Sequence, residues 1–116
     1  MSATPPDCLF CKIAAGEIPA TIVKRDGRLL AFRDIHPQAP THILVIPTQH
    51  VSTLDEARDA GLLGEMLLFA RTLARDEGIA QRGYRVVLNT NADGGQTVFH
   101  LHLHLLGGRR MTWPPG

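Results

Sequence analysis

Apolar residues recur at helical spacing through residues 53–78, which predicts one long amphipathic helix ending near Gly78. A shorter helix is expected over residues 8–15, with Asp7 as its N-cap and Gly16 just beyond its end. Elsewhere, apolar and β-branched residues come in short runs that are typical of strands. These runs cover residues 21–26, 28–35, 42–47, 84–89 and 98–106.

The connections between these runs indicate the fold class. Asp26-Gly27 separates the first two runs and is a two-residue hairpin signal, so those strands should pair antiparallel. Pro37 and Pro40 make the next segment a loop. Strands and helices do not alternate regularly as they do in βαβ units. We therefore predict an α+β fold, with a five-stranded antiparallel sheet, one long helix and one short helix.

The last run places histidine and leucine on alternate positions, from His100 to Leu105. Successive side chains of a strand point to opposite faces, so His100, His102 and His104 should share one face. We expect the leucines to pack on the core under the long helix and the histidines to border an open cleft. Residues two apart lie about 6.6 Å apart along a strand, so these imidazoles can line an extended ligand.

Composition narrows the class of protein. The chain has 116 residues, which suits a single domain over 1–116, with residues 1–6 expected to form a flexible tail. The formal charge of +1 provides no strong field for nucleic acid or anionic lipid, and we predict neither as a partner. The start of the chain lacks the pattern of a secretory signal and no apolar run reaches transmembrane length, so we expect a cytoplasmic protein.

Cys8 and Cys11 form a C-x-x-C pair. In a reducing compartment such a pair indicates a metal site or a redox motif before a structural disulfide. On a helix both thiols lie on one face and can meet one ion, and His50 and His100 would complete a Cys2His2 site for structural zinc. Two buried free thiols are the alternative.

The chain resembles the histidine triad family in the motif "HLHLHLL". The segments "CLFCKIAAGEIPA", "LAFRDIHPQAPTHILVIP", "GYRVVLN", "DGGQTVFHLHLHLLGG" and "WPPG" extend the resemblance to the Hint branch over nearly the whole chain. This resemblance implies hydrolysis or transfer at the α-phosphate of purine nucleoside monophosphate derivatives, AMP or GMP compounds, with phosphoramidates as typical substrates. It also implies a homodimer whose two sheets join into one.

The resemblance implies that His102 attacks phosphorus and forms a covalent nucleotidyl-histidine. A neutral imidazole can do this near pH 7 without a metal if one ring nitrogen is held protonated. His104 can donate to the phosphate or assist proton transfer, and His42 is placed to support it. Gly94 and Gly95 let backbone N–H groups approach phosphate, while Asn89, Gln96 and Thr97 can hydrogen-bond the phosphate or the leaving group.

The nucleoside has its own predicted contacts. The resemblance assigns Asp34 and Ile35 to the ribose, since a carboxylate can accept from both ribose hydroxyls. Trp113, in a tail over residues 109–116, is expected to reach the partner subunit's site. The apolar slot for the base comprises Leu9, Phe10, Ile13, Phe32 and Leu44. The same apolar residues could instead form ordinary core.

Two other functions remain open from the sequence. A dinucleoside polyphosphate hydrolase of the related Fhit branch is the alternative enzyme, although "WPPG" and the spacing in "DGGQTVFH" favour the Hint type. A nucleotide-binding regulator or a metal-storage protein is the alternative from another class.

Overall fold

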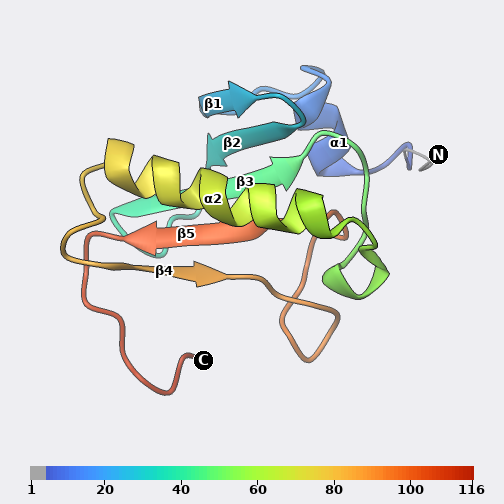
Figure 1. Cartoon of the computed structure of the whole chain (residues 1–116). Coiled ribbons are helices and arrows are strands. Elements are labelled where there is room, and N and C mark those ends of the chain that lie inside the picture. The colour runs from blue at the N-terminus through green and yellow to red at the C-terminus, as the bar shows by residue number, and fades with distance from the viewer. Residues whose placement is uncertain (1–4) are drawn as a thin grey trace.

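The computed structural model describes residues 5–116 and contains one five-stranded antiparallel sheet with two α-helices (Figure 1). The strand order is β1-β2-β3-β5-β4, so the last strand lies between the third and the fourth. This confirms the predicted α+β class and the number of strands. The elements are α1 (Leu9–Ala14), β1 (Ile22–Asp26), β2 (Leu29–Arg33), β3 (Thr41–Pro47), α2 (Ala60–Asp76), β4 (Tyr84–Val87) and β5 (Leu103–Gly107).

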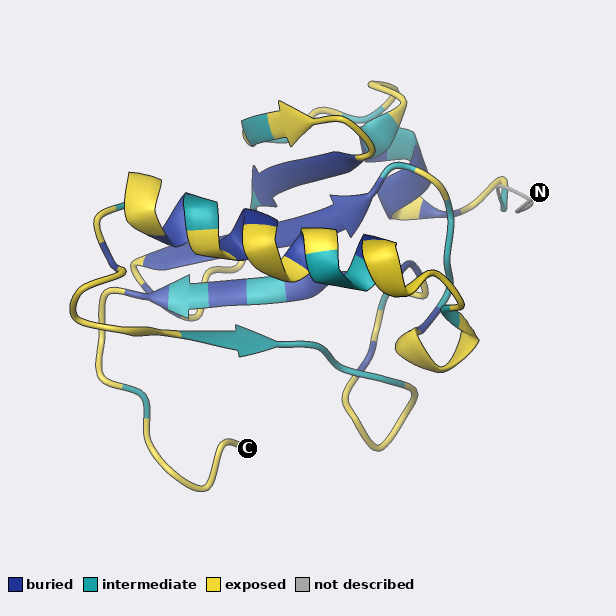
Figure 2. Cartoon of the chain, viewed as in Figure 1, coloured by how far each residue is buried: buried dark blue, intermediate teal, exposed yellow. Residues whose placement is uncertain are grey.

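The sheet carries one apolar cluster on each face. On the face covered by α2, Met66 and Leu73 pack against strand residues such as Ile43 and Val45. On the other face, α1 packs Phe10 and Ile13 against Phe32, Leu44 and neighbouring residues. Strands β2 and β3 are therefore buried almost throughout, as the dark central ribbons of Figure 2 show. Strand β5, which carries His104, pairs directly with the buried strand β3.

The expected helix over residues 53–78 is not continuous. A 3-10 turn covers Leu54–Glu56, and α2 begins only at Ala60. The Thr53 side chain accepts from the N–H of Glu56, and the Asp59 side chain accepts from the N–H of Leu62. Short polar side chains that bond to nearby backbone N–H groups start a helix rather than continue one, which explains the break.

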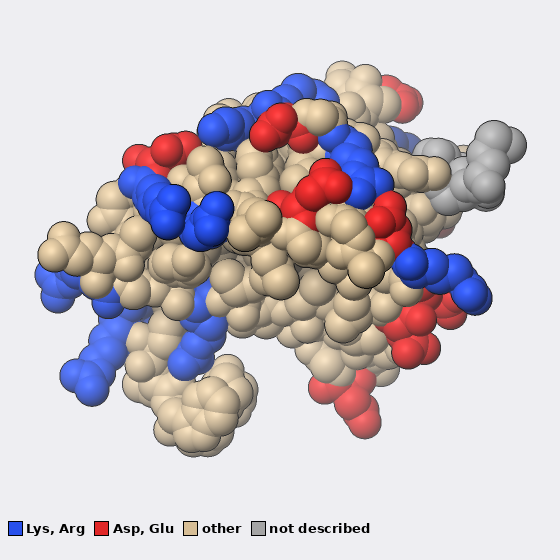
Figure 3. All heavy atoms as spheres, in the orientation of Figure 1, with Lys and Arg blue, Asp and Glu red and all other residues tan. Residues whose placement is uncertain are grey.

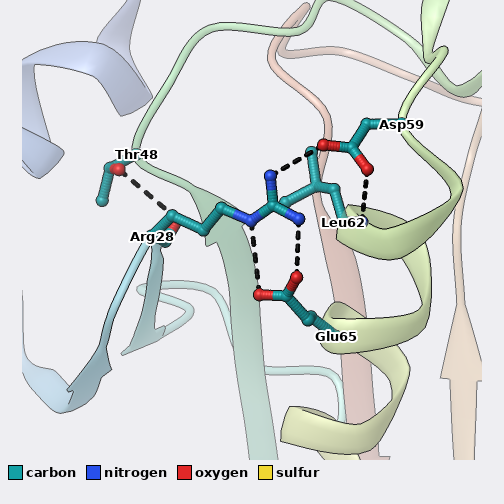
Figure 4. Close-up of polar contacts among 5 residues, drawn as sticks. All are labelled: Arg28, Thr48, Asp59, Leu62 and Glu65. Carbon is teal, nitrogen blue, oxygen red and sulfur yellow. Dashed lines mark hydrogen bonds and ion pairs between the residues drawn. The ribbon is translucent and has the colours of Figure 1, made fainter.

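Asp59 also takes part in an ion-pair cluster at the start of α2. Arg28, in the β1–β2 turn, donates to Asp59 at 2.7 Å and to Glu65 at 2.6 Å (Figure 4). The guanidinium lowers the pKa of both carboxyl groups through these hydrogen bonds. All three side chains are about half exposed, so the cluster positions the turn against α2 more than it stabilises the fold.

The last predicted strand is shorter than expected. Ladder pairing begins at Leu103, opposite Val45, rather than at Val98. Strand β3 continues past this point to Pro47 and there pairs with β2. The alternation of side chains nevertheless continues upstream. Leu101, Leu103 and Leu105 all lie in the core under α2, as predicted.

Two smaller predictions are also corrected. The side chain that caps α1 is Cys8 rather than Asp7, because Cys8 Sγ accepts from the N–H of Cys11. The hairpin turns at Gly27 and Arg28, since Asp26 is already paired with Leu29. Gly27 has a φ of 57°, the left-handed conformation that glycine adopts most easily. The ends of the other strands differ from prediction by at most two residues.

Charged side chains of both signs are distributed over the α2 side of the molecule (Figure 3). Neither described helix is long and apolar enough to cross a membrane. Of the predicted flexible tail, residues 1–4 lie outside the described part. Pro5 belongs to a turn in which its carbonyl accepts from the N–H of Cys8 at 3.2 Å.

Candidate active site and metal centre

The first cluster of the candidate site consists of Cys8, Cys11, His50 and His100, as the sequence predicts. The four ligand atoms lie within 4.8 Å of one another. His100 Nδ1 lies 3.3 Å from Cys8 Sγ and 3.3 Å from His50 Nδ1, and Cys11 Sγ lies 3.4 Å from each histidine Nδ1. A tetrahedral zinc ion would separate its sulfur and nitrogen ligands by roughly 3.3–3.6 Å. The cluster therefore has the spacing of a four-ligand metal centre.

The backbone prepares His100 for this role. His100 Nε2 lies 2.8 Å from the carbonyl oxygen of Pro47, which can only accept a hydrogen bond. The proton must therefore be on Nε2, and the lone pair on Nδ1 faces the cysteines. Burial lowers the pKa of His100 to about 4, so the ring is neutral at pH 7. A neutral imidazole is the form that binds metal.

The two cysteines also suit a bound cation. Burial and the neighbouring Cys8 raise the pKa of the Cys11 thiol to about 12, so a thiolate forms here only if a positive ion compensates it. A hollow of about 510 Å³ reaches the cluster from the surface and is lined by Cys8, His50 and Thr97, among others. The donor set, its spacing and its access all suit a metal ion.

His102 is separated from this cluster and has a different environment. Its Nδ1 lies 2.7 Å from the carbonyl oxygen of His100, which fixes the proton on Nδ1. The lone pair of His102 is consequently on Nε2. Its ring packs edge-on against Phe10, with the ring centroids 5.0 Å apart, and burial lowers its pKa. His102 is thus a buried, neutral imidazole with one nitrogen available as a nucleophile.

His104 and His42 form a second pair. His42 Nε2 lies 2.9 Å from His104 Nδ1, and the backbone N–H of Gln38 donates to His42 Nδ1 at 3.0 Å. Since Nδ1 of His42 accepts, its proton is on Nε2 and is donated to His104. His104 then carries its own proton on Nε2. Burial is the main reason that the pKa of His42 is lowered and that of His104 falls to about 4.

Asp34 lies beside this pair, at the end of β2. Its Oδ1 accepts from the backbone N–H of His36 at 2.8 Å, and its Oδ2 lies 3.4 Å from His42 Nε2. The negative charge of Asp34 raises the pKa values of His42, His102 and His104 against the effect of burial. The carboxylate therefore acts on all three imidazoles. The resemblance in sequence assigns Asp34 only to the ribose.

The glycine-rich loop is closed by its own polar groups. The Gln96 side chain is buried, accepts from the N–H of Asn91 at 2.8 Å and donates to the carbonyls of Ser52 and Val98. Gly94 approaches Thr90 so closely that a Cβ would lie 2.4 Å from its carbonyl oxygen. Thr97 is exposed and Asn89 is half-buried. The loop is thus a turn that its own backbone and the Gln96 side chain hold closed.

The residues of the predicted base slot fall into two groups. Phe10, Ile13, Phe32 and Leu44 are buried together in the cluster under α1. Leu9 is 42% exposed, and Ile35, assigned to the ribose, is 84% exposed. Only these last two side chains present substantial free apolar surface to a ligand. Trp113, in the segment that follows β5, is 81% exposed and leaves a large aromatic surface uncovered in the single chain.

Several groups that control this site could not be found in the sequence. The carbonyls of Pro47 and His100 and the N–H of Gln38 belong to the backbone, so no residue type marks them. The contact between Asp34 and His42 joins the end of β2 to the start of β3 across a loop. The only signal was an acidic residue directly after a strand, eight positions before a histidine.

Together, the fold and the site define a class: an α+β sheet protein that holds neutral histidines beside a glycine-rich turn, with a separate Cys2His2 cluster. A family model for the HIT domain matches residues 15–111, and the chain belongs to the HIT, or histidine triad, family. It is similar to a solved HIT family hydrolase from Legionella pneumophila Philadelphia 1. The TM-score is 0.93, the identity is 59%, and 95% of this chain and 100% of that one are covered.

Two further relatives are named for an activity or for a bound metal. The chain is 50% identical over 105 residues to the purine nucleoside phosphoramidase of Escherichia coli K12, which covers 89% of this chain and 88% of the relative. It is also 50% identical over 112 residues to the 14 kDa zinc-binding protein of Zea mays, covering 93% and 87%.

Proposed function

We propose that this protein is a Hint-type nucleotidyl hydrolase or transferase that cleaves purine nucleoside 5'-phosphoramidates of AMP or GMP. The observation that carries the proposal is the hydrogen bond from His102 Nδ1 to the carbonyl of His100 at 2.7 Å. It leaves a lone pair on Nε2 of a neutral imidazole, which a nucleophile requires. The phosphoramidase from E. coli K12 supports the class of substrate.

In the first step, His102 Nε2 attacks the α-phosphorus and the bond from phosphorus to the leaving nitrogen breaks. The departing amine takes up a proton, and His104 Nε2–H is the nearby donor. In the second step, water attacks phosphorus and gives a proton to His104 Nε2, which lost its own proton in the first step. The bond to His102 breaks, which releases the nucleoside monophosphate. The Thr97 hydroxyl would stabilise the negative phosphoryl oxygens. The N–H groups of Gly95 and Gln96 are not free for the role expected from the sequence, because they donate to the carbonyls of Ala92 and Asn91.

For the nucleoside, we propose that the exposed side chains of Leu9 and Ile35 flank the base and ribose at the edge of the cluster under α1. Asp34 retains lone pairs that can accept from the ribose hydroxyls. Trp113 would reach the partner's site in a homodimer, because its exposed indole has no covering surface within one chain. Gln96 and Asn89 would then act by shaping the loop.

For the metal centre, we propose structural zinc held by Cys8, Cys11, His50 and His100. A closed four-ligand set leaves no position for a catalytic water, so zinc would supply stability rather than chemistry. It would tie α1 to the segment before β5 and so fix the carbonyl that orients His102. The zinc-binding relative from Zea mays supports this choice of metal. Reduced thiols at this site also favour a cytoplasmic location.

The test is to trap the intermediate. The protein is mixed with adenosine 5'-phosphoramidate, quenched within milliseconds and digested, and the peptides are mapped by mass. We expect an adenylyl group on the peptide that contains His102, and none in His102→Ala. Turnover in His102→Ala should fall by at least about 10⁴-fold while substrate binding persists. Undiminished turnover in this variant, or a label on another residue, would refute the proposal.

The two alternatives give different outcomes. A dinucleoside polyphosphate hydrolase would cleave diadenosine polyphosphates faster than the phosphoramidate. A nucleotide-binding regulator would bind AMP without releasing product from either substrate.

A further inference from the structure

The protons of the His42–His104 pair can be counted from its hydrogen bonds. The Gln38 N–H occupies Nδ1 of His42, and the single proton of His42 lies between its Nε2 and His104 Nδ1. The pair therefore holds two protons, one on each Nε2, when it is neutral. If His104 gave up its Nε2 proton from this state, an imidazolate would remain, which is far too basic near pH 7. To act as an acid, the pair must first hold a third proton.

The only free position for a third proton is His104 Nδ1, because Gln38 blocks Nδ1 of His42. Two N–H groups would then face each other across the 2.9 Å separation. That repulsion is removed if the His42 Nε2–H turns to another acceptor. Asp34 Oδ2, at 3.4 Å from the same nitrogen, is in the right place to accept it. Asp34 is partly exposed and His42 is almost completely buried, so the carboxylate is the solvent-facing end of this chain of groups.

We propose that Asp34 is a positioning residue for acid catalysis, which accepts the His42 Nε2–H and so allows the His42–His104 pair to carry the proton delivered to the leaving group. This inference rests on the proposed function and adds to it. In the step, the cationic pair transfers the His104 Nε2 proton to the departing nitrogen as its bond to phosphorus breaks. The pair is then neutral, with one proton on His42 Nε2 and one on His104 Nδ1, and the free His104 Nε2 can take the proton of the water that attacks in the second step. Asp34 remains a carboxylate throughout.

The other charged and titratable groups around His104 do not replace Asp34. His102, whose ring centroid is 5.0 Å away, has its Nδ1 proton committed to the His100 carbonyl. Arg109 Nε donates to the carbonyl of Gln38, the residue whose N–H donates to His42, and does not contact either histidine ring through this bond. Among the described groups that shift the pKa of His104, Asp34 is the one that raises it. Burial and the other two histidines lower it.

The test compares two leaving groups in wild type and Asp34→Asn. Asparagine keeps the shape and an accepting oxygen for the ribose but removes the charge. Adenosine 5'-phosphoramidate needs a proton on its leaving nitrogen, whereas the para-nitrophenyl ester of AMP releases a stable anion. We expect kcat for the phosphoramidate to fall by about 10–100-fold and kcat for the ester to change by less than about threefold. The high-pH limb of the phosphoramidate profile, where the pair loses its third proton, should move to lower pH.

Asp26→Asn, at the exposed end of β1, is the matched control and should change neither substrate. If Asp34 serves only the ribose, Asp34→Asn will raise KM equally for both substrates and leave the ratio of their kcat values unchanged. That result would overturn the inference while the function stands. If wild type hydrolyses neither substrate, the proposed function itself fails.

Discussion

Lowering the pH should destabilise the folded protein through His104, which is buried as a neutral ring. Its pKa falls from an ordinary value of 6.5 to about 4 in the folded state, chiefly because burial disfavours the charged form. Between these two values the unfolded chain binds a proton that the folded chain does not. Stability from this group is therefore complete above about pH 6.5 and is lost as the pH falls toward 4.

Each pH unit in this window costs about 1.4 kcal/mol of unfolding free energy per group, so the whole window from 6.5 to about 4 costs about 3–3.5 kcal/mol. Urea unfolding at half-unit steps from pH 4.5 to 7.5 would measure it. We expect His104→Gln to show a slope about 1.4 kcal/mol per pH unit shallower than wild type below pH 6.

His36→Gln removes an exposed histidine and serves as the control, with an expected slope equal to that of wild type. Both variants keep the cysteine cluster, so any loss of metal at low pH cancels in the comparison. Parallel curves for wild type and His104→Gln would refute the idea that His104 is held neutral by burial. They would also remove the basis for the proton count in the His42–His104 pair.

His104→Ala should reduce phosphoramidate turnover by about 10²–10⁴-fold, less than His102→Ala, because it removes an acid but leaves the nucleophile; equal losses in steady-state kinetics would contradict this. Elemental analysis should find one zinc per chain, and Cys11→Ser should abolish it and lower the melting temperature; full zinc content in that variant would refute the ligand set. Gly107→Ala should cost about 1–3 kcal/mol, because its Cβ would lie 2.4 Å from Ile79 Cδ1. Ile79→Val removes that Cδ1 atom, so the double variant should lose less unfolding free energy than the sum of the two single variants. Strictly additive losses in urea unfolding would count against the clash. Sedimentation should show a homodimer at micromolar concentration, and a stable monomer would exclude the proposed role of Trp113.

The features that depend on local chemistry were predictable from the sequence. Alternation of leucine and histidine gave the two faces of the last strand, and the Asp26-Gly27 signal gave the antiparallel hairpin within one residue of its turn. The C-x-x-C pair with His50 and His100 gave the four groups of the cluster, which the fold brings together.

The features that depend on distant backbone were not predictable. The insertion of β5 between β3 and β4 follows from how buried faces pack, and local propensity contains no information on it. The break before α2 depends on whether Thr53 and Asp59 bond to backbone N–H groups or face solvent, which pattern alone does not decide. The tautomers of His42, His100 and His102 are set by peptide groups that tertiary structure delivers.

The two-sided chemistry of β5 also protects the protein from misassembly. In the native pairing Ile43 is opposite Leu105 and Leu44 is opposite His104. A slip of one residue would turn every side chain of this strand to the other face. The imidazoles would then be buried in the apolar core under α2, and leucines would take the place of the histidines that face Cys8 and His42. A wrong register loses both hydrophobic burial and the geometry of the metal and histidine sites. The alternating sequence therefore favours the native register over a shifted one during folding.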